Sequence, residues 1–339
     1  MAKNKGKIKM HSSINISSQE TWSEYNKKES RRYKNTPNNW KDSINDSSNS
    51  EKEKMLFKYC LENNRKMVKM LVPSDDVDMN CVDADGNTPL MFAVKSGQRE
   101  VVEYLLKNEA KVDYLNNKGI SPLHLAVRKN SLLLARLILG YGADLNITDP
   151  YNQTVLFDAV VENNVDMADF LVFTGININH QNREGKTPLM VCTYNSSRQE
   201  VFSRLLQLGA RIDIVDENGQ DVLMHAINNE NGAMMDILLK AGANINHCDN
   251  RGNDALMTCA EKGNREGLRV LISRGANIFR ENKEGQSALD IARECGNTTC
   301  YEILAKARKI CLSNIPDKEK REQLKQFAKH NRMENSCIR

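Results

Sequence analysis

The sequence predicts an all-α solenoid, a stack of helix-turn-helix units joined by β-turn or hairpin-like loops and flanked by disordered tails. Three observations lead to this prediction. A seven-residue pattern recurs at a fixed interval, each recurrence begins with residues that start helices, and charge and composition change at both ends of the chain. Together they indicate a repetitive helical body between two tails of different composition.

The N-terminal segment, residues 1–52, is predicted to be a disordered tail. It is rich in Asn, Ser and Lys and shows no sustained hydrophobic period. Residues 1–50 carry 10 Lys and Arg against 5 acidic residues. The cluster KKESRRYK (Lys27–Lys34) is typical of nuclear-import signals and nucleic-acid-binding patches, and it is also common in solvated tails.

Residues 53–308 are predicted to form the repeat array. The stretches NTPLMFA (Asn87–Ala93), ISPLHLA (Ile120–Ala126) and KTPLMVC (Lys186–Cys192) are separated by multiples of 33 residues. Asn152 takes the glycine position in the one unit that lacks it, because Asn tolerates positive φ. The turn glycines on this period are Gly86, Gly119, Gly185, Gly219, Gly252 and Gly285.

Each unit has the same internal order. A turn precedes Thr, Ser or Asp, often followed by Pro, and this pair suits the N-cap and first position of a helix. A short apolar helix follows, then a second one such as EVVEYLL (Glu100–Leu106), and a glycine turn such as GADLN closes the unit. One such unit cannot bury its apolar face alone, so neighbouring units must stack.

At these residues the chain resembles the ankyrin-repeat family, whose signature is a 33-residue period with T-P-L-H-x-A. The stretch SPLHLA (Ser121–Ala126) fits apart from its first residue, and the starts at Thr88 and Thr187 carry Met in the His position. The resemblance covers seven units from about Asp83, preceded by a degenerate unit, MLFKYCLENNRKMVKMLV. It implies an ankyrin-type solenoid that binds partners on its turn tips and on the inner face of its first helices.

The C-terminal segment, residues 309–339, is predicted to be a second basic tail, with a mainly polar helix over residues 317–332. Residues 305–339 carry 10 Lys and Arg against 4 acidic residues. The remaining residues, 51–304, carry 28 Lys and Arg against 35 acidic residues. The protein is therefore an acidic body with two basic tails.

No constellation for catalysis or metal binding stands out. Dinucleotide, P-loop, HExxH, GxSxG and kinase motifs are missing from the sequence. Cys60, Cys192 and Cys259 fall in a position that is Ala in the other units, which favours packing. His180 and His247 lie two units apart, and Cys295 and Cys300 lack zinc-ligand spacing. We therefore expect no enzyme, no catalytic residue, no cofactor and no metal.

The compartment is predicted to be the cytoplasm, the nucleus or both. No apolar run reaches the roughly 18 residues of a membrane span, and the basic N-terminus has no apolar segment after it. The nine cysteines contain no C-x-x-C pair, which favours reduced thiols.

A partner-binding surface is predicted on the inner face. The position two residues beyond the small Ala or Cys runs from basic through apolar to acidic: Lys95, Arg128, Val161, Tyr194, Asn228, Glu261 and Glu294. Aromatic residues and Arg are enriched at binding hot spots, so Tyr151, Val161 and Tyr194 are the predicted centre. The full predicted set is Arg128, Lys129, Tyr151, Val161, Arg183, Tyr194, Asn228 and Arg251.

The leading functional hypothesis is a monomeric, non-catalytic adaptor or scaffold for a protein partner. One alternative is a nuclear regulator or nucleic-acid-associated protein that uses its basic tails, although the acidic body disfavours nucleic acid as a ligand of the array. Another is an inhibitor that masks a basic partner segment, similar to the inhibitors of NF-kappaB. The resemblance also implies candidate sites of asparagine hydroxylation at Asn146, Asn179 and Asn246.

Overall fold

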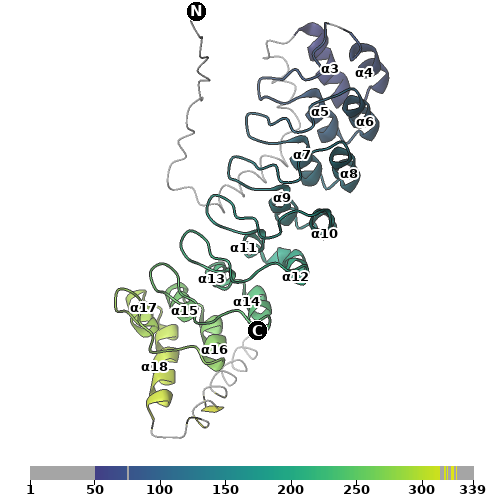
Figure 1. The fold of residues 1–339 in the computed structure, drawn as a ribbon. Coiled ribbons are helices and arrows are strands. Elements are labelled where there is room, and N and C mark those ends of the chain that lie inside the picture. Colours follow the sequence, from purple (N-terminus) through teal and green to yellow (C-terminus); the bar gives the residue numbers. More distant parts are fainter. Residues whose placement is uncertain are drawn as a thin grey trace, which may run out of the picture.

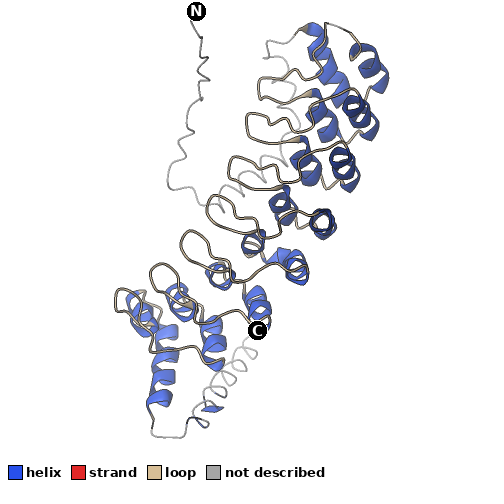
Figure 2. Ribbon diagram, in the orientation of Figure 1, coloured by secondary structure: helices blue, strands red, loops and turns tan. Residues whose placement is uncertain are grey.

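A computed structural model describes residues 50–74 and 76–313, and beyond them only residues 317, 319, 322, 323 and 326. Eight consecutive pairs of helices stack into a curved array (Figure 1). The first helix of each pair and the connecting loops line the inner side of the curve, and the second helices form its outer side (Figure 2). The described part of the chain contains no β-strand, so the predicted all-α solenoid is confirmed.

The helix pairs agree with one degenerate unit followed by seven clear ones. In chain order they are α3 (Glu51–Leu61) with α4 (Arg65–Leu71), α5 (Pro89–Ser96) with α6 (Arg99–Lys107), α7 (Pro122–Arg128) with α8 (Leu132–Gly140), α9 (Val155–Val161) with α10 (Val165–Thr174), α11 (Pro188–Cys192) with the short 3₁₀ helix η1 (Ser196–Arg198) and α12 (Gln199–Gln207), α13 (Val222–Asn228) with α14 (Gly232–Lys240), α15 (Ala255–Lys262) with α16 (Arg265–Ser273), and α17 (Ala288–Glu294) with α18 (Thr298–Leu312).

The first helices begin where the N-cap pattern predicts. The Thr88 hydroxyl accepts the Met91 backbone N–H at 3.4 Å, and Pro89 occupies the first helical turn. Units that carry Asp instead use its carboxylate, as Asp254 does when it accepts the Met257 N–H at 2.9 Å. Each cap satisfies a backbone donor that the helix itself leaves unpaired.

The turns require a left-handed residue at the glycine position. Gly86 has φ of 77°, and Asn152 adopts φ of 60° at the equivalent position, which confirms that Asn replaces Gly there. At Gly119 a side chain is also excluded by space, because a Cβ atom would lie 2.3 Å from Cδ of Pro150 in the next repeat.

Backbone hydrogen bonds join neighbouring turn tips into a ladder. The rungs run from the N–H of Asn117 to the carbonyl of Asp85 (3.0 Å), Arg183 to Tyr151 (2.9 Å), Glu217 to Glu184 (3.1 Å), Asn250 to Asn218 (2.9 Å) and Lys283 to Arg251 (3.0 Å). The equivalent donor in the remaining repeat is position 150, a proline, which has no N–H. Among the described turns from Asp83 onward, the ladder is therefore interrupted once, between the α7/α8 and α9/α10 repeats.

The core runs continuously between the two layers of helices. Cys60, Cys192 and Cys259 are fully buried in it, as are the alanines at the same position of other repeats, such as Ala126. Burial raises the pKa of the Cys192 thiol to about 12, which leaves it protonated and unreactive. These cysteines are packing residues, as predicted.

The second helices pack closely against their neighbours along the outer side, with one exception. Close packing joins α4 to α6 and α6 to α8, and it continues from α10 through α12, α14 and α16 to α18. In the described chain only α8 and α10 fall short of this packing. The exception coincides with the interrupted rung at Pro150.

The ends of the array extend slightly beyond the predicted limits. Helix α3 begins at Glu51 rather than 53, because Ser50 and Glu53 form a capping box. Helix α18 continues to Leu312, past the predicted end at 308, because Ala307 is still buried against the core. The cluster Lys27–Lys34 and most of the predicted helix 317–332 lie outside the described residues, so the two tails remain predictions.

No described helix combines the length and the apolar character that crossing a lipid bilayer requires.

Candidate partner-binding surface

The eight predicted partner-binding residues lie on turn tips or at the inner ends of first helices. Lys129, Arg183 and Arg251 are exposed. The other five are half-buried: Arg128, Tyr151, Val161, Tyr194 and Asn228. They do not form one cluster, because Asn228 and Arg251 belong to repeats further along the array.

Arg128 is engaged in an ion pair between repeats. Its Nε lies 2.7 Å from Oδ1 of Asp158, and the two side chains are only 19% and 12% exposed. Burial raises the pKa of the Asp158 carboxyl, and the Arg128 guanidinium opposes that rise. Arg128 therefore holds α7 to α9 as well as contributing charge to the inner face.

Tyr151 and Arg183 lie on adjacent turn tips. The Tyr151 N–H donates to Oδ1 of Asp149 at 2.9 Å, and its carbonyl accepts the Arg183 N–H at 2.9 Å. The main chain thus fixes the distance between these two tips independently of their side chains.

Tyr194 is the most firmly held of the predicted aromatic residues. Its ring meets that of His225 edge-on, with centroids 6.2 Å apart, and the Lys186 ammonium lies 5.6 Å from its centroid. Burial raises the pKa of the Tyr194 phenol, with Lys186 acting in the opposite direction. His225 is itself buried and lies 3.0 Å from a carboxylate oxygen of Asp216. His225 is therefore a packed residue of this region.

Val161 packs against the core, and its backbone carbonyl forms a hydrogen bond to the next repeat. Its carbonyl accepts from Nη2 of the buried Arg198 at 3.2 Å, and the carbonyl of Val191 accepts from Nη1 at 3.1 Å. Arg198 is the N-cap residue of α12 and stands where other repeats have a shorter residue such as Asn231, in the one unit that has an extra residue. Its longer side chain reaches the carbonyl of Val161 in the previous repeat, as the shorter Asn231 side chain reaches the carbonyl of Thr193.

The histidines of the closing turns have a role that sequence reasoning missed. Nε2 of His180 lies 2.8 Å from the carbonyl oxygen of Asn152, and Nε2 of His247 lies 2.8 Å from that of Gly219. Each imidazole thus links its repeat to the previous turn. The signal was present in the sequence, because both residues follow the same Asn-Ile-Asn triplet.

The asparagines at the candidate hydroxylation position differ in their surroundings. Asn146 and Asn246 are exposed, whereas Asn179 accepts the Arg211 N–H at 2.9 Å through its side-chain oxygen. Their modification stays a prediction.

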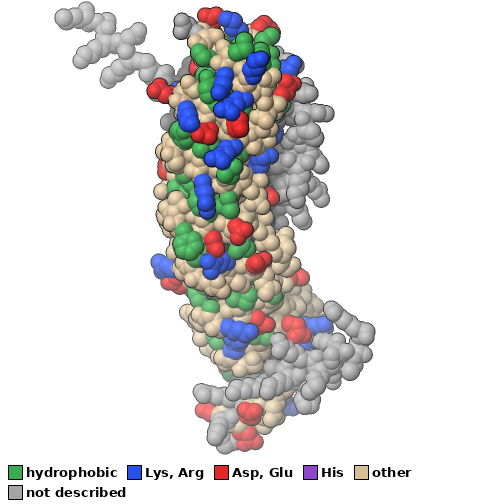
Figure 3. Space-filling view, turned by 90° about the vertical axis from the view of Figure 1, so that its right-hand side faces the viewer, with side chains coloured by type: hydrophobic (Ala, Val, Ile, Leu, Met, Phe, Trp, Pro, Cys, Tyr) green, Lys and Arg blue, Asp and Glu red, His purple; other side chains and the backbone are tan. Residues whose placement is uncertain are grey.

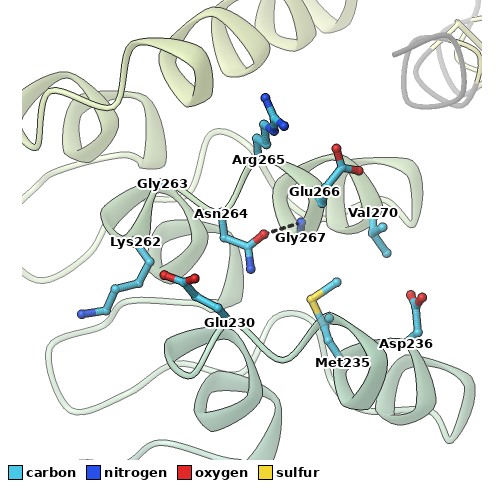
Figure 4. A pocket seen from close by; sticks show the side chains of 11 residues that line it. Glu230, Met235, Asp236, Lys262, Gly263, Asn264, Arg265, Glu266, Gly267 and Val270 are labelled. Atoms are coloured by element: carbon cyan, nitrogen blue, oxygen red, sulfur yellow. Dashed lines mark hydrogen bonds between the residues drawn. The ribbon is translucent and has the colours of Figure 1, made fainter. Parts of the chain in front are cut away.

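A polar hollow lies between the α13/α14 and α15/α16 repeats (Figure 4). Glu230, Lys262 and Arg265 surround it, and Oδ1 of Asn264 accepts the Gly267 N–H at 2.8 Å. None of the eight predicted residues lines it. Charged residues of both signs line it, and no His or Cys does, so the lining does not indicate a particular ligand or reaction.

The outer face is of mixed character. Figure 3 shows hydrophobic side chains there in small groups, interspersed with charges of both signs.

Among the described residues, no group of three or more His, Cys, Asp and Glu side chains is placed to hold a metal ion.

Comparison with known proteins agrees with the repeat pattern and the fold. A sequence model of ankyrin repeats in sets of three copies matches residues 38–116, 56–149, 110–182, 156–249, 190–282 and 223–315. The crystal structure of the ankyrin repeat domain of Bcl-3 is similar, with a TM-score of 0.59 and 31% sequence identity, over 65% of this chain and 99% of that one.

Curated relatives share parts of their length with this chain. Human transient receptor potential cation channel subfamily A member 1 is 25% identical over 247 residues, which cover 50% of this chain and 22% of the relative. Human ankyrin repeat and SOCS box protein 6 is 30% identical over 147 residues, which cover 39% of this chain and 35% of the relative. The chain thus spans about a third or less of these two relatives. Its matched repeats and its stacked helix pairs show that the chain belongs to the ankyrin-repeat family.

Proposed function

We propose that the chain is a non-catalytic adaptor or scaffold that binds a protein partner through the inner face and turn tips of its array, in the cytoplasm or the nucleus. One observation carries this proposal. The backbone of the tips and first helices repeats from unit to unit, whereas the side chain at the inner-face position varies along the array, from Lys95 through Tyr194 to Glu294. A constant frame with variable side chains is what selective recognition of one extended surface requires.

The centre of this surface is proposed to include the adjacent tips of Tyr151 and Arg183 and the nearby repeat that carries Tyr194. Both residue types are enriched at hot spots of interfaces. The backbone rung between the first two and the packing around the third fix them before any partner arrives. Such preorganisation lowers the entropic cost of association.

The test uses the full chain as bait in extracts of its own cells, followed by binding measurements with the purified partner. The variant Tyr151→Ala with Arg183→Ala removes both side chains and leaves the backbone rung intact. It should weaken binding at least roughly thirtyfold, which corresponds to about 2 kcal/mol at a hot spot.

A matched control lies on the outer face. Tyr301 is 37% exposed on α18, and Lys306 is exposed on the same helix, so Tyr301→Ala with Lys306→Ala removes the same kinds of side chain. This control should bind normally and keep the wild-type melting temperature. Normal binding by the tip variant, together with loss of binding on deletion of residues 1–50, would move the site to the tail.

A second candidate is an inhibitor that masks a basic segment of its partner. The observation that favours it is the similarity to Bcl-3, which is described as a member of the IkappaB protein family. On this hypothesis the acidic body supplies the binding charge. A lysine-rich peptide should then bind the full chain at low salt and compete with the captured partner.

A further inference from the structure

The outer face carries an apolar patch where helices α8 and α10 lie side by side. Leu133 of α8 is 52% exposed and Phe173 of α10 is 75% exposed. Leu137 and Phe170 lie one turn away on the same side of each helix and are half-buried. The guanidinium carbon of Arg136 lies 5.3 Å from the centroid of the Phe170 ring, so outward side chains of the two helices meet. We call Leu133, Leu137, Phe170 and Phe173 the outer patch.

The repeat pattern shows that the outer patch is an exception. Leu133 and Phe173 follow the N-cap residues of their helices, Ser131 and Asn164, by two and nine positions. At the Leu133 position the other repeats have Lys66, Glu100, Asp166, Glu200, Ala233, Glu266 and Thr299. At the Phe173 position they have Pro73, Lys107, Gly140, Gln207, Lys240, Ser273 and Lys306. None of these is aromatic or a large aliphatic residue, and neighbouring exposed apolar side chains typically mark an interaction site.

The surroundings of the outer patch favour a basic ligand with apolar side chains. The two nearby cations are already engaged, because Arg136 stacks on Phe170 and Arg204 pairs with Asp169. Asp166 is exposed on the same side of α10, one turn before Phe170. The patch therefore combines apolar surface with an exposed carboxylate.

The N-terminal segment of the same chain has the complementary composition. Residues 1–49 lie outside the described residues, but their sequence contains both tryptophans of the protein, Trp22 and Trp40. These two flank the basic cluster Lys27–Lys34. The repeat that supplies Phe170 and Phe173, residues 149–181, contains five acidic residues and no Lys or Arg. Aromatic and basic groups of the segment thus match the apolar patch and the acidic repeat.

The segment is long enough to reach the outer patch. The patch lies two to three repeats from Ser50, a distance of about 20–30 Å at the spacing of packed helices. Ten residues lead from Trp40 to Ser50, and an extended chain of this length spans about 33 Å. Because the segment is tethered, its local concentration at the patch is high.

We propose that the N-terminal segment docks on the outer patch through its tryptophans and places the basic cluster against the acidic repeat. The segment adds to a face that is already folded, so the array does not need it to fold. This inference goes beyond the proposed function and does not depend on it, because Tyr151 and Arg183 lie on the turn tips and docking needs no partner.

Tryptophan fluorescence of the full chain tests the proposal, since both tryptophans lie in the segment. A peptide of residues 1–49 supplies the emission wavelength and acrylamide quenching of the undocked segment. The full chain should emit at shorter wavelength and be quenched less than this peptide. The variant Leu133→Lys with Phe173→Lys should return both values to those of the peptide. It should keep the wild-type melt, because Lys66 and Lys107 occupy the same positions in other repeats.

A second variant separates apolar contact from charge. Leu133→Gln with Phe173→Gln removes the apolar side chains and adds no charge, and it should also release the tryptophans. If only the lysine variant releases them, charge repulsion explains the effect and the outer patch is not the site.

The matched control repeats the lysine substitutions on another pair of second helices. Ala233→Lys with Ser273→Lys places two lysines at the same positions of α14 and α16, and it should keep the wild-type fluorescence. Equal release by both lysine variants would overturn the proposal.

Two further outcomes would also overturn it. Wild-type fluorescence equal to that of the peptide would show that the segment is not docked. Protection that appears only at concentrations where light scattering shows a doubled mass would show that a second copy, rather than the chain's own segment, is required.

Discussion

At the residue scale, the small position in each first helix controls how closely the two helices of a repeat approach. Cys259 fills this position in α15, and a Cβ atom on Gly267 of α16 would lie only 2.9 Å from its sulfur. Cys259→Leu should therefore overpack the contact and lower the free energy of unfolding by about 1–3 kcal/mol. Urea midpoints in reducing buffer measure this. The exposed Cys295→Ser should be neutral, and equal shifts, or a midpoint that depends on zinc, would contradict a packing role.

The ion pair of Arg128 and Asp158 makes a pH-dependent prediction. Burial already raises the pKa of Asp158, and Arg128→Met would raise it further by removing the cation. When the pKa of a carboxyl is higher in the folded protein than in the unfolded chain, the protein loses stability as the pH rises from the unfolded pKa through the folded pKa. Arg128→Met should therefore cost about 3 kcal/mol at pH 7 and distinctly less near pH 4, as measured by urea unfolding at both values.

Adding Asp158→Leu to that variant should remove the pH dependence, because it removes the carboxyl. Leu fits this position, since Leu125 and Val191 occupy the equivalent position in neighbouring repeats. A persistent pH dependence would mean that another group is responsible. Arg128 was predicted from the sequence to lie on the partner surface, but its ion pair with Asp158 was not predicted. The available signal was a single Asp at a position that is apolar in the two neighbouring repeats.

At the element scale, the junction between the α7/α8 and α9/α10 repeats differs from the others. Pro150 removes one rung of the tip ladder, and α8 and α10 lack the close packing of other second helices. Three buried side-chain atoms at this junction have no hydrogen-bond partner among the described residues: Gln153 Nε2, Thr154 Oγ1 and Asp158 Oδ2. Buried polar groups without partners cost stability.

Hydrogen exchange should therefore detect local opening at this junction. Among the internal second helices, the amides of α8 and α10 should exchange faster than those of α12, which packs closely on both sides, because regions with fewer contacts open at lower free energy. Mass spectrometry of native-state exchange at neutral pH measures the order. Faster exchange in α12 would show that the missing rung and the reduced packing are compensated.

The helices themselves could be predicted because period, N-cap residues and turn glycines all depend on local sequence. The weak junction between the α7/α8 and α9/α10 repeats could not be predicted. A 33-residue period identifies equivalent positions, but it does not say which main-chain atoms meet across repeats. The consequence of Pro150 follows only once the ladder between tips is known, as for Asn117 with Asp85.

At the scale of the whole molecule, charge alternates along the stack. Residues 149–181 contain five acidic residues and no Lys or Arg. Arg128 reaches this repeat from one side, and Arg204 reaches it from the other, with its Nε 2.6 Å from Oδ1 of Asp169. These pairs link three consecutive repeats, so the order of the repeats is specified by charge as well as by the shared apolar core.

The array should fold without either tail. Its first helix is capped by Ser50 within the array, and its last helix buries Ile303, Leu304 and Ala307 before ending at Leu312. Circular dichroism melts of residues 50–313 and of the full chain should differ by less than about 4 °C, roughly 1 kcal/mol for a domain of this size. A larger drop would show that residues beyond these limits complete the fold. If the shortened chain melts normally and keeps the partner, binding resides in the array; if it melts normally and loses the partner, the tails supply the contact and the inner-face proposal fails.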